Sequence, residues 1–191
     1  RLSAAKTAMK KVERSDILDY VTYEEQRAEI RANAMQTKDL RRIHVGENLT
    51  FLFENTETIR YQILEMVRAE KIVKEADILH EIKTYNELIG ENGEICVTLL
   101  VEIDDPNERA EKLKTWVGLP EKLYLKFADG SKAYAQVDER QNEDEKISSV
   151  QFLKFNCDGK TPVAIGSEHS AYQVEANLTN EQKTALESDL A

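Results

Sequence analysis

Residues 94–103 read Glu-Ile-Cys-Val-Thr-Leu-Leu-Val-Glu-Ile and form the most apolar stretch of the chain. Side chains alternate between the two faces of a strand, and here both faces are largely apolar. Such runs are typical of strands that are buried on both sides. The stretch therefore predicts a central strand. It is far shorter than the ~18 apolar residues of a membrane-spanning helix, so we expect no membrane span.

The sequence before this strand predicts a helix, a β-hairpin and two further helices. Ser15 or Asp16 can cap the first helix, and Asn55 can cap the second. Gly46 lies in a turn between two short extended segments, which favours a hairpin, and Gly90 ends the last helical pattern. In order, we expect a helix over 15–35, strands over 42–45 and 49–54, a helix from 56 to about 70, and helical spacing from about 76 to 89.

The sequence after the central strand predicts mostly strands. Asp105 and Pro106 are a helix-start pair, Asp129-Gly130 is a hairpin turn, and Thr179 with Gln182 can form a capping box. We expect a helix to about 116, strands over 122–128, 132–137, 149–156 and 163–165, an acidic loop over 138–145, an ambiguous segment over 172–178 and a terminal helix.

These elements predict an α+β fold. We expect a single domain over residues 9–191, with an antiparallel or mixed sheet of about six strands and helices mainly on one face. Residues 1–8 are small, basic and unpatterned. They lack the apolar core of a secretory signal and are therefore not an intact one. We interpret them as an extension, a tag or the remnant of a presequence.

Composition limits the possible partners. The 36 acidic and 26 basic residues give a net charge of −10, which disfavours nucleic-acid binding, since phosphate contacts need a basic face. The two cysteines, Cys96 and Cys157, form no Cys-x-x-Cys pair. Free cysteines fit a reducing compartment, so we expect a cytoplasmic protein.

Established catalytic and phosphate-binding motifs are absent from the sequence, and no cofactor is predicted. Asp77 and His80 stand three residues apart on a helix and are weak metal-ligand candidates, because a carboxylate-bridged di-iron bundle needs two Glu-x-x-His pairs and two further Glu residues. His169 lies in an expected loop, where an imidazole can bind a ligand or transfer protons near neutral pH. Ordinary solvated side chains are the alternative for all three.

The segment from Phe51 to Glu70 is the preferred candidate surface. Polar strand-to-helix junctions often carry function, and carboxylates in a concave junction can bind metal or act as an acid–base pair. Its candidate residues are Glu54, Asn55, Gln62, Glu65 and Glu70. The alternative is structural: Asn55 caps the helix, Glu54 pairs with Arg42 or Arg60, and Gln62 and Glu65 face water. Arg42, with Arg41, can also grip a carboxylate or phosphate.

Several ordered segments are similar to the bacterial family catalogued as domain of unknown function 3501. They include Ser15-Asp-Ile-Leu-Asp-Tyr20, Arg41-Arg-Ile-His-Val-Gly46, Thr84-Tyr-Asn-Glu-Leu-Ile89, Ser148-Ser-Val-Gln-Phe-Leu-Lys-Phe155 and Val163-Ala-Ile-Gly166 with His169. Together the similar segments span roughly residues 9–190. Some relatives carry His where Gln151 and Lys154 stand here. The resemblance adds Tyr85 and Asn86 to the candidate binding residues.

The family has no established activity, but its members are often encoded beside rubrerythrin-like and cysteine-rich iron–sulfur proteins. The resemblance therefore implies a non-catalytic accessory role beside a redox or peroxide-defence metalloprotein. One rival hypothesis is a small enzyme or a metal- or ligand-binding domain with a polar pocket around Glu54-Asn55 and Gln62-Glu65. A second is a structural subunit of a larger assembly.

Overall fold

The computed structural model describes residues 9–138 and 145–191. Within them, helices and antiparallel sheets occur in the mixed order expected, which confirms the α+β class. The helices are η1 (Arg14–Asp16), α1 (Tyr20–Asp39), α2 (Thr56–Ala69), α3 (Glu75–Asn86), α4 (Pro106–Thr115), η2 (Pro120–Lys122) and α5 (Asn180–Leu190). The strands are β1 (Arg42–Val45), β2 (Leu49–Phe53), β3 (Glu94–Val101), β4 (Leu123–Lys126), β5 (Lys132–Tyr134), β6 (Gln136–Val137), β7 (Val150–Asn156), β8 (Ala164–His169) and β9 (Tyr172–Asn177).

The strands of the described chain form two sheets rather than the one sheet of about six strands that we expected. The first has the order β1-β2-β3-β7-β6, with β3 in its centre as predicted, and the second has the order β5-β4-β8-β9. The split occurs at Ala135. Tyr134 pairs with Tyr124 in the second sheet, whereas Gln136 pairs with Lys154 in the first. One continuous segment therefore passes from sheet to sheet, which its alternating sequence does not reveal.

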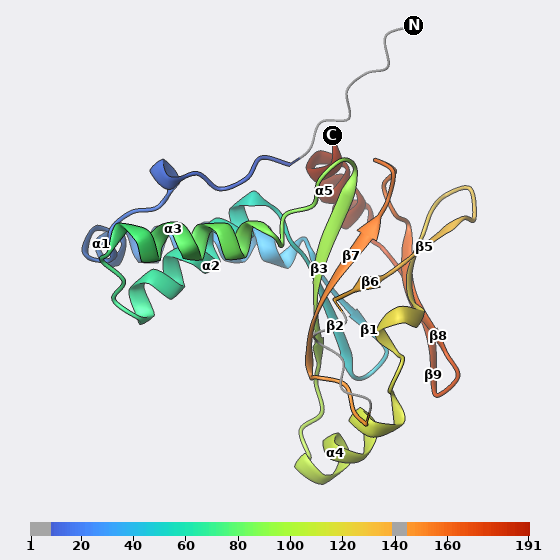
Figure 1. Cartoon of the computed structure of the whole chain (residues 1–191). Coiled ribbons are helices and arrows are strands. Elements are labelled where there is room, and N and C mark those ends of the chain that lie inside the picture. The colour runs from blue at the N-terminus through green and yellow to red at the C-terminus, as the bar shows by residue number, and fades with distance from the viewer. Residues whose placement is uncertain (1–8, 139–144) are drawn as a thin grey trace, which may run out of the picture.

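The two sheets face each other and enclose the main hydrophobic core. Phe51, Phe53, Leu99, Phe155 and Leu125 are fully buried there. Figure 1 shows α4 and α5 at opposite ends of the sheets, where residues such as Trp116 and Leu186 close the interior. Burial of large apolar side chains of this kind is the main stabilising contribution in a domain of this size.

A second hydrophobic cluster holds the helices together. Figure 1 shows α1, α2 and α3 side by side on one side of the sheets. Tyr23 of α1, Ile63 and Leu64 of α2 and Ile82 of α3 are buried against one another. Val12 of the N-terminal segment joins the same cluster. These three helices, α1, α2 and α3, form a helical layer. It covers one end of the outer face of the first sheet and leaves the other end open.

Tyr172 of β9 closes the seam between the two sheets on the side opposite the β5–β6 crossing. Its hydroxyl accepts hydrogen bonds from the backbone N–H groups of Glu47 (3.1 Å) and Asn48 (3.3 Å) and donates to the carbonyl of Val45 (3.4 Å). Gly46 has φ +66°, and a Cβ there would lie 2.2 Å from this hydroxyl. A glycine is therefore required by both the turn and its neighbour.

The first helix begins later than predicted. Residues 14–16 form only a 3-10 turn, and α1 starts after Asp19, whose side chain accepts from the N–H groups of Val21 and Thr22. Asn55, Asp105 and Thr179 cap their helices as predicted. The segment 172–178, which was ambiguous, is strand β9. The extension 1–8 and most of the acidic loop 138–145 lie outside the described residues. In the described ranges, no helix combines the length and apolar character needed to cross a membrane.

Candidate functional site

Glu54 and Asn55 at the β2–α2 junction are buried, with 7% and 9% of their surfaces exposed. Glu54 accepts hydrogen bonds from the hydroxyls of Thr58 and, at 3.0 Å, Thr98. Burial raises the pKa of its carboxyl group, against the opposing effect of these two hydroxyls and of Lys38. Burial in turn lowers the pKa of the Lys38 ammonium group.

Asn55 is committed to structural contacts. Its side chain accepts from the N–H of Thr58 as the cap of α2, and its amide donates to Asp189 of α5 at 3.2 Å. The junction therefore joins the first sheet, the helical layer and the C-terminal helix. The polar side chains of Glu54 and Asn55 are buried and make hydrogen bonds within the protein.

Glu65 lies between α1 and α2 in a polar network. Arg27 donates to both of its oxygens (3.0 and 2.9 Å), and the Tyr61 hydroxyl donates at 2.7 Å. These hydrogen bonds, first of all those from Arg27, lower the pKa of Glu65 to about 2. The hydroxyl of Tyr23 is buried nearby and has no hydrogen-bond partner within the described part of the chain. Glu65 is therefore a charged partner of Arg27 and is not an acid–base group for neutral pH.

The other sequence candidates are spread over the surface. Arg42 pairs with Asp39 at 3.0 Å. Gln62 is half-buried, and Glu70 is exposed at the end of α2. Tyr85 packs against the helical cluster. The structure does not gather these residues into one site.

His169 lies at the end of strand β8. The N–H of Ala171 donates to Nδ1 (3.1 Å), so the ring proton is on Nε2, which lies 2.9 Å from the carbonyl of Val117. Asp77 and His80 are exposed on α3. Among the described residues, no group of three His, Cys, Asp or Glu side chains gathers as a metal ion requires.

The two cysteines are free and buried. Burial raises the pKa of Cys96 to about 11 and that of Cys157 to about 12. The thiolate is the nucleophilic form of cysteine. Neither side chain is therefore activated for nucleophilic chemistry at neutral pH.

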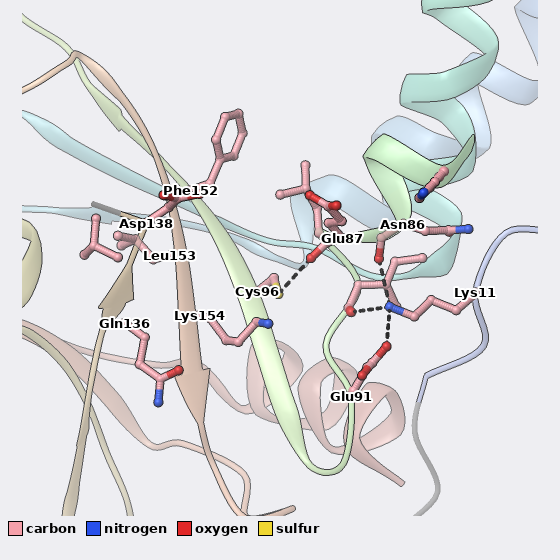
Figure 2. Close-up of a pocket in the computed structure, with 14 residues that line it drawn as sticks. Lys11, Asn86, Glu87, Glu91, Cys96, Gln136, Asp138, Phe152, Leu153 and Lys154 are labelled. Carbon is pink, nitrogen blue, oxygen red and sulfur yellow. Dashed lines mark hydrogen bonds and ion pairs between the residues drawn. The ribbon is translucent and has the colours of Figure 1, made fainter. Parts of the chain in front are cut away.

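A pocket of about 630 Å³ lies on the outer face of the first sheet, beside the end of α3. Its floor follows from the strand register. Lys154 of β7 pairs with Cys96 of β3 on one side and with Gln136 of β6 on the other, so the three side chains form one row. Phe152, two residues earlier on β7, points from the same face. Figure 2 shows the Lys154 side chain extending from β7 toward the helical side of the pocket.

The opposite wall is built by the end of α3 and the N-terminal segment. The Asn86 side chain accepts from the N–H of Val12 (2.9 Å) and donates to its carbonyl (3.0 Å). The Lys11 ammonium group donates to the carbonyls of Asn86 (2.9 Å) and Ile89 (3.1 Å) and pairs with Glu91 at 3.0 Å (Figure 2). A lysine at a helix C-terminus offsets the negative end of the helix dipole. Lys11 is thus a fixed part of the wall.

Asn86 is the one sequence candidate that lines this pocket. The others that shape it, among them Lys11, Gln136, Phe152 and Lys154, were not predicted. The alternation of β7 marks Phe152 and Lys154 as sharing a face. No local signal pairs that face with the end of α3.

Similar proteins identify the family of this chain. A crystal structure of a protein of unknown function from Burkholderia pseudomallei is similar, with a TM-score of 0.86 and 30% sequence identity over 95% of this chain and 100% of that chain. No curated protein matches. The family model described as a protein of unknown function, DUF3501, matches residues 11–190. With nearly the whole chain matched, this protein belongs to the DUF3501 family.

Proposed function

We propose that this protein is a binding protein for a small molecule and that the pocket between α3 and the β7–β6 edge is its binding site. The observation that carries the proposal is the floor of that pocket. Lys154 is half-buried, and neither its ammonium group nor the Gln136 amide makes a hydrogen bond or ion pair with residues 9–138 or 145–191. Small-molecule sites combine such unsatisfied polar groups with apolar walls in volumes of about 300–1,000 Å³.

The test compares the wild-type protein with Gln136→Trp. Gln136 is exposed on the outer face, so an indole there fills the pocket without entering the core. Both proteins are purified under native conditions, and their bound small molecules are identified by mass spectrometry. We expect one compound to be enriched with the wild type and lost with Gln136→Trp. Asn177→Trp, at an exposed position of β9, is the control and retains the compound. Equal small-molecule contents in all three proteins would contradict the proposal.

A second candidate function is the accessory role beside a redox metalloprotein. It is favoured by an apolar strip next to the pocket, formed by Leu100, Val150 and Phe152, whose exposed fractions are 37%, 41% and 41%. Leu100 and Val150 are direct cross-strand partners. Exposed apolar patches on monomers are frequent interaction sites. The rubrerythrin-like or iron–sulfur identity of the partner rests on the family context.

This second candidate has its own test. The purified protein is mixed with a purified rubrerythrin-like protein from the same organism, and the complex is sought by sedimentation velocity. Leu100→Lys places a charge in the strip and abolishes a complex that uses it. Val117→Lys, at a comparably exposed apolar position (38%) outside the strip, is the control. The absence of a complex with the wild type at micromolar concentrations contradicts the accessory role with this partner.

A further inference from the structure

We propose that the pocket takes an organic anion, whose negatively charged group lies against the Lys154 ammonium group and whose apolar part lies against Phe152. This inference rests on the proposed function, because it names the ligand class of the same pocket. It assigns a specific role to one lysine of a strongly acidic protein.

The position of Lys154 is the first argument. Its two cross-strand neighbours, Cys96 and Gln136, bear no charge. No carboxylate of the described residues comes within 4.0 Å of its ammonium group. An anion bound against Lys154 would accept a charge-assisted hydrogen bond from its ammonium group. The chain carries ten more acidic than basic residues, yet no acidic residue within 9–138 or 145–191 forms an ion pair with Lys154.

Glu91 is a carboxylate of the pocket whose charge interacts with that of Lys154, but its ion pair is with Lys11. Lys11 and Glu91 are paired with each other, and Lys11 also neutralises the end of α3 through two carbonyls. Lys83, Glu87 and Asp138 are exposed at the rim. Solvent and salt screen such exposed charges more strongly than those on a pocket floor. Lys154 is therefore a cation on the pocket floor that forms no ion pair with residues 9–138 or 145–191.

The apolar part of the ligand is inferred from Phe152 and Leu88. Phe152 projects from the same strand face as Lys154 and has 41% of its surface exposed, and Figure 2 shows its ring above the floor. Leu88 is half-buried on the helical side. The Gln136 amide adds a donor and an acceptor. The combination suits a molecule with an anionic head and a ring or short chain, since small-molecule sites combine hydrophobic and aromatic walls with a few placed polar groups.

The experiment uses four small probes of matched size. Phenyl phosphate and 3-phenylpropionate are the anions, 2-phenylethylamine is the cation and 2-phenylethanol is neutral. Each is titrated to about 10 mM into the isotopically labelled protein, a range that detects weak ligands. Amide chemical shifts are followed by NMR. We expect saturable shifts at residues 86–89, 136 and 152–154 with at least one anion, and none with the cation. The two anions distinguish phosphate from carboxylate recognition.

Variants then assign the charge. Lys154→Met keeps the length of the side chain and is expected to weaken anion binding by roughly tenfold or more, whereas Lys154→Arg keeps the affinity within roughly threefold. Lys114→Met removes a charge from an exposed position of α4 and leaves binding unchanged. Raising the salt concentration weakens binding to the wild type but not residual binding to Lys154→Met. Unaltered thermal unfolding confirms that each variant is folded.

The outcomes separate this inference from the proposed function. If the cation or the neutral probe binds as well as the anions, or if Lys154→Met binds them normally, the anion inference is overturned. A compound that co-purifies with the wild type and is lost with Gln136→Trp would still support the pocket in that case. The absence of saturable shifts with both anions also overturns the inference. The proposed function fails as well only if no compound that co-purifies with the wild type is lost with Gln136→Trp.

Discussion

Arg41 and Asp189, which lie 148 positions apart in the sequence, form a bidentate ion pair. The Nε–Oδ2 distance is 2.8 Å and the Nη2–Oδ1 distance is 2.9 Å. Their side chains are only 9% and 7% exposed. Arg41 follows α1, and Asp189 lies near the end of α5. The remaining Arg41 Nη1 donor reaches the carbonyl of Thr37 at 3.0 Å. The pair therefore ties the C-terminal helix to the junction of helical layer and first sheet.

Removing one partner of this pair is expected to destabilise the fold strongly. Asp189→Asn leaves the buried Arg41 without a countercharge, and breaking one side of a buried ion pair costs about 3–5 kcal/mol. The free energy of unfolding is measured with urea. Glu75→Gln is the matched control, because it breaks the exposed Arg14–Glu75 pair and is expected to cost at most about 1 kcal/mol. Equal losses for both variants would contradict the structural role assigned to Arg41 and Asp189.

Glu54 is expected to make the protein less stable as the pH rises. Burial raises its pKa above the ordinary value of 4.5, so the folded chain holds a proton that the unfolded chain has released. Stability then falls between pH 4.5 and the pKa of the folded state. Glu54→Gln removes this titration but keeps an amide that can bond Thr58 and Thr98. The variant is expected to lose less stability than the wild type between pH 5 and pH 8.

The measurement is urea unfolding of both proteins at the two pH values. Lys38 titrates in the opposite sense, and the charge of Glu54 raises its pKa. The comparison therefore reports the titration of Glu54 together with its effect on Lys38. Glu187→Gln, exposed on α5, controls for the change in net charge and keeps the wild-type dependence on pH. A parallel dependence on pH in wild type and Glu54→Gln would show that Glu54 is ionised to the same extent in the folded and unfolded chains.

Local patterns predicted most of the elements. Helix caps such as Asn55 and Asp105 are decided within three or four residues of sequence, and so is the Asp129-Gly130 hairpin. The number of sheets was not predictable in this way. It depends on Ala135, where a strand changes partners, and partner choice is set by packing across the whole domain rather than by the residues of the strand itself.

Most residues of the pocket were not predicted, for a related reason. The sequence draws attention to clustered polar residues such as Glu54, Asn55 and Glu65, and the structure uses these three in its own hydrogen bonds. The pocket instead combines Lys154, which the register of β3 with β7 places beside Cys96, with Lys11, which is held by the carbonyls of Asn86 and Ile89. A single sequence does not specify that register, because the alternation of β7 fixes only which residues share a face.

Gly46 and Gly118 allow backbone strain to be separated from crowding. Both have positive φ angles, +66° and +83°, but a Cβ at Gly118 would meet no atom within 4 Å, whereas one at Gly46 would overlap the Tyr172 hydroxyl. Gly118→Ala is expected to cost about 1 kcal/mol, for strain alone. Gly46→Ala is expected to cost more, because Tyr172 must also give up its bonds to the β1–β2 turn. Thermal unfolding measures both, and Tyr172→Phe shows how much of the excess belongs to the hydroxyl. Similar losses for the two alanine variants would contradict crowding by Tyr172.

Glu65 is expected to stabilise the contact between α1 and α2 in a way that acid removes. Its pKa is lowered from 4.5 to about 2, so the folded chain releases a proton that the unfolded chain still holds below pH 4.5. The stabilisation is complete above pH 4.5 and is lost as the pH falls toward 2. Glu65→Gln turns one acceptor into a donor that faces Arg27, and at pH 7 we expect it to cost about 1.5 kcal/mol.

The same argument predicts that the difference in the free energy of unfolding between the wild type and Glu65→Gln becomes smaller in acid. At about pH 2.5 the wild-type carboxylate is close to losing its charge, and its advantage over the amide narrows. Urea unfolding at pH 7 and pH 2.5 measures the difference. The control is Glu29→Gln, which is exposed on the same helix as Arg27 and changes the net charge equally. Its free energies of unfolding at pH 7 and pH 2.5 are expected to stay near those of the wild type. Because Arg27 stays charged throughout, a difference that persists in full at pH 2.5 would mean that Glu65 acts through packing rather than through its charge.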